Sequence, residues 1–204
     1  MKKPSDFSRL MGYAGGHRVF TYASLALSAV SALMALLPFL YIWRILRDVL
    51  AAAPDYTQAV NIPHYGWMAV LFAVLSYLIY VCALLCSHLS AFRVATKLRL
   101  AVTKHLAELP LGFTERFGSG QLRKIIQEST GAAETYLAHQ LPDQAGAMAT
   151  PAGLLVLLFA FDWRLGLLSL VPVFLGFAVM SAMTGKRMEE KMRQYGNALA
   201  AMSN

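Results

Sequence analysis

Residues 65–109 read YGWMAVLFAVLSYLIYVCALLCSHLSAFRVATKLRLAVTKHLAEL, and the architecture of the chain follows from this stretch. From Tyr65 to Ser87 it contains no Asp, Glu, Lys or Arg, so it is long enough for a helix that crosses a bilayer. The second half is polar, yet apolar residues recur at helical spacing, at Phe92, Ala95, Leu98, Val102, Leu106 and Leu109. Because Gly and Pro are absent between Leu89 and Pro110, we expect one continuous helix that leaves the membrane as a rod.

The composition favours a membrane protein. Hydrophobic residues make up 57% of the 204 residues and charged residues 14%, whereas about 25% is usual in soluble domains. A chain of this size exposes too much surface to hide that apolar content in water. Cys82 and Cys86 are too few for a disulfide scaffold. We attribute the net charge of +7 to basic loops on one side of a membrane and expect no nucleic-acid partner.

Three further runs satisfy the same test for a membrane helix. The predicted spans cover about residues 19–42, 65–88, 143–161 and 165–185. Pro38, Pro151 and Pro172 fall inside these runs, where membrane helices tolerate proline. The first run begins too late and is too long for the apolar part of a cleaved signal peptide.

Lys and Arg are distributed unequally between the segments that join the spans. All but three of the 18 basic residues precede span 1, lie between spans 2 and 3, or follow span 4; the exceptions are Arg44, Arg47 and Arg164. The positive-inside rule therefore predicts that both termini and the long middle segment are cytoplasmic. On the opposite side we expect a loop over residues 43–64 and a tight hairpin at residues 161–164.

The middle segment predicts two arms joined at a tip. Leu109-Pro110-Leu111-Gly112 ends the first rod, and Gly118-Ser119-Gly120 marks a second break. Residues 121–141 are again helical in pattern and return to span 3, while residues 186–204 form a second cytosolic rod. The predicted fold class is an all-α membrane protein with four transmembrane helices and long cytoplasmic helical extensions.

This pattern resembles the first part of the transmembrane domain of ABC exporters with the six-helix, domain-swapped fold (type IV). The tip carries the resemblance at the family spacing, through Leu109-Pro110, Phe113, Glu115, Gly120, Leu122 and Ile126. The turn Asp162-Trp163-Arg164-Leu165 is similar to the family's outer turn between helices 3 and 4. The resemblance extends from about Arg9 to Asn204.

The resemblance implies a coupling helix that docks on an ATP-binding domain. Its residues would be Phe113, Thr114, Glu115, Arg116, Phe117, Gly118, Ser119 and Gly120. It also implies three partners: a nucleotide-binding domain, a second transmembrane half in a homo- or heterodimer, and the lipid bilayer, here a bacterial inner membrane. The family transports substrates at the expense of ATP, and the resemblance leaves the substrate-binding residues unknown.

The chain departs from the family pattern in two respects. Ser129 stands where the family often has Asp, beside Glu128, so the local salt bridges are expected to differ. No phosphate loop is present, since Gly185-Lys186 is followed by Arg187, and there is no Leu-Ser-Gly-Gly-Gln signature. We therefore expect no catalytic or metal site here, with ATP and Mg on a missing or partner domain. The sequence ends before a second coupling helix, which predicts an incomplete chain that does not transport alone.

Two other functions remain open. The first is a stand-alone four-span scaffold or anchor for a cytosolic protein. The second is a small transporter in its own right, which is disfavoured because the interiors of the four predicted spans contain no charged side chain for coupling, and Asp143 stands only at the edge of the third span.

Several local clusters allow two interpretations each. Cys82, Cys86 and His88 could bind a metal, but a packed cysteine pair is favoured. Polar residues at the start of span 3 favour a helix cap, with a helix restart at Pro142-Asp143, over a functional site; they are His139, Gln140, Asp143 and Gln144.

Small and aromatic residues in the spans also allow two interpretations. Ser24, Ser28 and Ala32 favour a packing face over substrate contact. Pro151 with Gly153 and Pro172 with Gly176 mark either gating kinks or packing sites. Aromatic residues could line a cavity or face lipid; they are Tyr22, Phe39, Tyr41, Phe72, Tyr77 and Tyr80.

Overall fold

The computed structural model describes residues 6–110, 112, 118, 120, 122–184 and 186–202, and these ranges hold helices and no strand. Among them are four stretches long and apolar enough to cross a membrane: Phe7–Ala52, Ile62–Ala107, Ile126–Phe161 and Trp163–Met183. The predicted all-α membrane fold is confirmed. The chain divides into two compact units, Met1–Gly153 and Leu154–Asn204, which are described separately.

The predicted first span consists of two helices. A short helix α1 (Asp6–Ala14) and a 3-10 turn η1 (Gly15–His17) precede α2 (Arg18–Met34) and α3 (Leu37–Ala52). Pro38 has no N–H to offer the carbonyl of Met34, the residue at which α2 ends. The Leu36 amide instead reaches the Leu33 carbonyl at 3.1 Å, a tighter 3-10 bond that bridges the break.

The outer connection is shorter than predicted. Helix α3 continues to Ala52, ten residues beyond the expected end of the span, and α4 begins at Ile62. Only residues 53–61, which include the 3-10 turn η2 (Tyr56–Gln58), join the two helices. The expected loop over residues 43–64 was therefore wrong, because charged side chains mark the edge of the apolar region and not the end of a helix.

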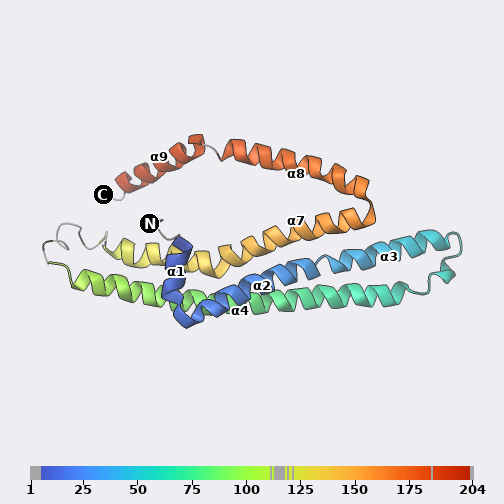
Figure 1. Cartoon of the computed structure of the whole chain (residues 1–204), viewed down its shortest axis with the longest axis horizontal. Coiled ribbons are helices and arrows are strands. Elements are labelled where there is room, and N and C mark those ends of the chain that lie inside the picture. Colours follow the sequence, from blue (N-terminus) through green and yellow to red (C-terminus); the bar gives the residue numbers. More distant parts are fainter. Residues whose placement is uncertain are drawn as a thin grey trace. The chain divides into compact units, whose positions relative to one another are not determined.

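Helix α4 (Ile62–Ala107) is one unbroken helix of 46 residues, as predicted. At 1.5 Å per residue it is about 69 Å long, more than twice the roughly 30 Å of a bilayer core. Helices α2 and α3 run along it in the opposite direction, as Figure 1 shows.

Small hydroxyl side chains fill the contact between α2 and α4. Thr21 and Ser90 share a hydrogen bond of 2.6 Å, and Ser31 Oγ donates to the Ser76 carbonyl at 2.8 Å. Ser24 and Ser28 are buried in the same seam, which confirms the packing face predicted for them. Such small side chains let two helices approach closely. Ala32 lies outside this seam, near Gly146 of the third long helix.

The helix that returns from the tip runs without interruption into the third predicted span. It comprises a π-helix η3 (Lys124–Ser129), α6 (Thr130–Thr135), a second π-helix η4 (Tyr136–Gln140) and α7 (Leu141–Phe161). The predicted helix restart at Pro142-Asp143 was therefore wrong. Pro142 cannot donate to the Ala138 carbonyl, and Ser87 Oγ of α4 donates to that oxygen at 2.8 Å in its place.

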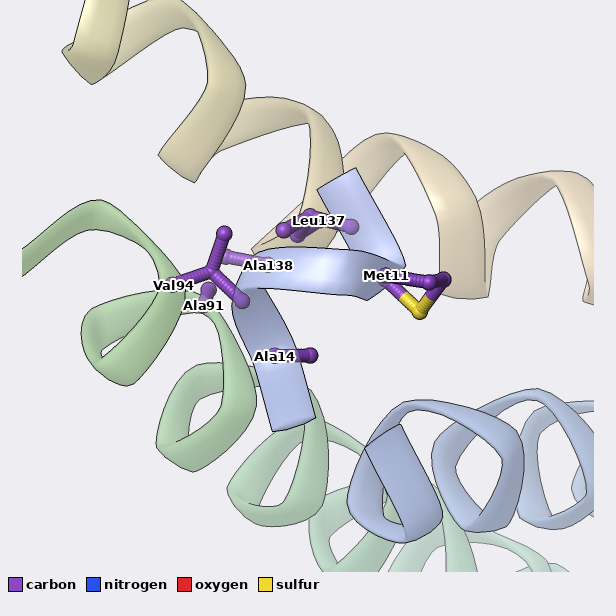
Figure 2. Packing of buried hydrophobic residues seen from close by; sticks show 6 residues of the cluster. All are labelled: Met11, Ala14, Ala91, Val94, Leu137 and Ala138. Carbon is purple, nitrogen blue, oxygen red and sulfur yellow. The ribbon is translucent and has the colours of Figure 1, made fainter. Parts of the chain in front are cut away.

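Helix α1 packs where α4 meets η4, and sequence analysis did not predict it. Figure 2 shows Met11 and Ala14 of α1 beside Val94 of α4 and Leu137 of η4. All four are buried, and Ala91 and Ala138 complete this apolar cluster. The pattern Phe7, Leu10, Met11, Ala14, one apolar stripe at helical spacing, could have revealed α1.

The second unit contains the end of α7, then α8 (Trp163–Met183) and α9 (Lys186–Met202). The predicted tight hairpin is present, because Asp162 Oδ1 accepts a hydrogen bond of 2.8 Å from the Arg164 amide and so caps α8. Gly166 lies against the ring of Phe159, where a Cβ would come within 2.8 Å of the ring. Most apolar side chains of α8 are exposed within the unit; they include Leu168, Phe174, Leu175, Phe177 and Met180.

Candidate functional site

The residues predicted to form the coupling helix follow the end of α4 in the sequence. Of these, Phe113, Thr114, Glu115, Arg116, Phe117 and Ser119 lie outside the described residues. Gly118 and Gly120 are described, and Gly118 has φ +71°, a backbone conformation that glycine adopts without the strain a Cβ would add. The two arms are the end of α4 and the returning helix, which includes η3.

A charged contact joins the two arms near the tip. Arg99 Nη2 of α4 lies 2.7 Å from Glu134 Oε2 of α6, and Arg99 Nε donates to Thr130 Oγ1 at 3.2 Å. The Thr130 hydroxyl is buried and also donates to the carbonyl of Ile126. Arg99 and Glu134 are partly exposed, so the pair contributes at most about 1 kcal/mol. Glu134 thus supplies the local salt bridge, and Ser129 and Glu128 take no part in it.

A second contact joins the arms closer to the membrane, beside the Ser87–Ala138 hydrogen bond. The rings of His88 on α4 and His139 on η4 meet edge to face, with centroids 4.8 Å apart. Cys82 is exposed and Cys86 half-buried. Within the described residues, no three His, Cys, Asp or Glu side chains gather as a metal site would require. His88 and His139 thus contribute a ring contact between the two arms.

The polar residues at the start of α7 do not cap a free helix end, because α7 continues the π-helix η4 without a break. Asp143 Oδ1 instead accepts a hydrogen bond of 3.2 Å from the hydroxyl of Tyr80 on α4. Gln140 and Gln144 are exposed. The predicted cap was therefore wrong, and Tyr80 and Asp143 form a polar link between α4 and α7.

The aromatic residues considered as cavity lining do not converge. Tyr41 of α3 stacks on Phe72 of α4, with ring centroids 5.6 Å apart. Tyr22, Phe39 and Tyr77 are exposed. Gly153 of α7 serves packing, since a Cβ there would come within 2.8 Å of Leu33 and Leu36 side-chain atoms.

Residue Asp55 organises the short outer connection. Its carboxylate accepts hydrogen bonds from the Thr57 hydroxyl at 2.6 Å, the Thr57 amide and the Gln58 side chain. These bonds, the one from the Thr57 hydroxyl foremost, lower the pKa of Asp55 below its ordinary value. The turn η2 is therefore held by an ionised carboxylate.

The end of α4 and the returning helix thus form a long hairpin whose two arms are linked by Arg99–Glu134 and Ser87–Ala138. Residues 21–204 match the ABC transporter transmembrane region family. The chain belongs to this family. The match begins inside α2 and covers the rest of this ABC transmembrane chain, including most of the first long helical stretch and all of the other three, in agreement with the expected fold.

Two kinds of curated protein are similar in sequence to this ABC transmembrane chain. The mycobactin import ATP-binding/permease protein IrtA of Mycolicibacterium smegmatis is 32% identical over 162 residues, which cover 78% of this chain and 18% of the relative. The ATP-dependent lipid A-core flippase of Idiomarina loihiensis is 33% identical over 176 residues, 84% of this chain and 29% of the relative. The chain therefore spans less than a third of the length of these curated relatives.

Proposed function

We propose that this ABC transmembrane chain is the permease part of an ATP-driven transporter. The observation that carries the proposal is the long helical hairpin, in which Arg99–Glu134 and Ser87–Ala138 link α4 to the returning helix. A membrane anchor has no need of a helix about 69 Å long. The names of the relatives, one an import permease and one a flippase, support transport.

In this proposal the hairpin transmits movement from a nucleotide-binding domain. ATP and Mg bind to that domain, and residues 113–120 at the tip form the contact to it. Because ATP binds the closed form of its domain better, it shifts the transporter toward that form. The fastened arms then move as one body and change the side to which the membrane cavity opens.

A second transmembrane half completes the transporter in this proposal. The exposed apolar side chains of α8, such as Phe174 and Phe177, support such a partner, because a span in an assembly packs on other helices. The distribution of Lys and Arg supports cytoplasmic termini. The bacterial sources of the relatives support a bacterial inner membrane.

The experiment that tests the proposal is site-specific photocrosslinking in membranes of the host cell. A photoreactive phenylalanine analogue replaces Phe117 at the tip, and in a control chain it replaces the exposed Val60 of the outer connection. We expect Phe117 to give an adduct with a polypeptide that contains a phosphate loop, in a yield that changes with ATP. Val60 should give none. An adduct only with proteins that lack an ATP-binding domain would favour the scaffold alternative and contradict transport.

A further inference from the structure

A cluster of aromatic rings surrounds Arg44 where α3 and α4 approach the outer connection. The Arg44 guanidinium carbon lies 5.7 Å from the ring centroid of Tyr41 and 5.9 Å from that of Tyr65. Tyr41 is held in turn by its stack on Phe72. Both helices therefore contribute to the position of one cation, at cation–π distances on each ring.

The charge of Arg44 is not neutralised within the described part of the chain. No carboxylate there lies within salt-bridge distance of it. Arg47, one turn further along α3, differs: its guanidinium lies over Trp43, and its Nη2 is 3.1 Å from Asp48. The Tyr rings face the guanidinium but accept none of its in-plane N–H bonds. Within the described part of the chain the Arg44 guanidinium makes no hydrogen bond, so its five N–H donors are available there for an anion.

The surroundings of Arg44 fit an amphipathic anion. Ile42 and Trp67, which flank the cluster in sequence, are exposed apolar side chains. Tryptophan and tyrosine at the end of a span are typical of the headgroup level of a bilayer. A planar guanidinium matches the oxygens of a phosphate with two parallel hydrogen bonds. A phospholipid brings the phosphate and the acyl chains to such a surface in one molecule.

We propose that Arg44, held by Tyr41 and Tyr65, binds the phosphate of an anionic lipid headgroup at the outer ends of α3 and α4. The site holds one headgroup and is independent of transport, because it requires only these two helices. Free inorganic phosphate has the same chemistry, so the test must separate the two sources.

Tryptophan quenching by brominated lipids tests the site in the full chain. Trp67→Phe and Trp163→Phe leave Trp43, one residue before Arg44, as the fluorophore. The chain is reconstituted in phosphatidylcholine vesicles that contain brominated phosphatidylglycerol or brominated phosphatidylcholine. We expect Trp43 to prefer phosphatidylglycerol at least about fivefold, the effect of one basic residue near a charged surface. Equal quenching by the two lipids would overturn the proposal, whatever the variants do.

Two variants show which arginine causes the preference for phosphatidylglycerol. Arg44→Gln should remove it, with a loss of about fivefold. Arg47→Gln should change it less than about twofold, because Arg47 lies outside the ring cluster and is paired with Asp48 at 3.1 Å. Unchanged quenching by brominated phosphatidylcholine confirms that α3 of each variant is still inserted. Arg44→Gln with the preference of the parent would overturn the assignment to Arg44.

Inorganic phosphate distinguishes the two sources. An excess of it should reduce the lipid preference no more than sodium chloride of equal ionic strength does, since both salts screen charge alike. Selective displacement of phosphatidylglycerol by phosphate would overturn the lipid as the ligand and assign the site to free phosphate.

Discussion

The hydroxyl of Ser87 on α4 donates a hydrogen bond of 2.8 Å to the carbonyl of Ala138, the oxygen that Pro142 leaves without its helical partner. We expect Ser87→Ala to lower the free energy of unfolding in detergent micelles by about 1–2 kcal/mol, because a buried carbonyl loses its donor. Thermal unfolding followed by circular dichroism measures the loss.

The matched background for this experiment is Pro142→Ala, which restores a backbone N–H four residues after Ala138. In that background Ser87→Ala should cost clearly less, since the carbonyl has a second donor. An equal cost in both backgrounds would show that Ser87 acts by packing alone.

Loss of the Arg99–Glu134 pair should let the two arms open locally. In Arg99→Gln, amides of residues 122–135 should exchange with solvent about twofold to fivefold faster, corresponding to the loss of up to about 1 kcal/mol. Hydrogen exchange with mass spectrometry measures it, and the difference should shrink in high salt. Arg193→Gln is the control, because its partner Glu190 lies on the same helix. Equal exchange in Arg99→Gln and the parent would rule out a fastening role.

The absence of a side chain at Gly153 allows α7 to pack closely against Leu33 of α2. Gly153→Ala should lower stability by up to about 1 kcal/mol, because the new Cβ would come within 2.6 Å of a Leu33 methyl carbon and the flexible end of that side chain must shift. Gly146→Ala on the same helix is the control, since its Cβ would meet Ala32 at 3.9 Å, an ordinary contact. Thermal unfolding of both variants, followed by circular dichroism, measures the two changes in stability. Leu33→Ala should restore part of the loss, and its failure to do so would contradict the clash.

Asp55 predicts the pH response of the outer connection. Because its folded-state pKa is lowered, its stabilising effect is complete above the ordinary aspartate pKa and is lost as the pH falls through the folded-state value. Thr57→Val removes the main donor and should raise the pKa of Asp55, whereas Thr57→Ser should leave it low. Carboxyl carbon NMR of labelled protein measures both. A low pKa in Thr57→Val would assign the shift to another group.

The four spans follow from the sequence because a run without charges is a local property with a large transfer energy. Helix ends did not follow, since Arg44 and Asp48 are compatible with helix beyond the apolar run. The continuity at Pro142 could not be predicted, because the compensating donor Ser87 lies 51 residues from Ala138. The site around Arg44 likewise requires the register of two helices. The tip residues Phe113 and Glu115 rest on the family resemblance alone.

The hydroxyl seam between α2 and α4 forms in two steps during synthesis. The hydrogen bond between Thr21 and Ser90 can form only after the ribosome has added Ser90, 69 residues after Thr21. At about 5–20 residues per second this delay is roughly 3–14 s. During that interval the first span has no neighbour from this seam. Its hydroxyls can then turn back to carbonyls of their own helix, as Ser24 does with the carbonyl of Thr21. The hydroxyl groups of the nascent span are thus hydrogen-bonded within their own helix while the span faces lipid. When α4 arrives, its side chains replace only these local hydrogen bonds.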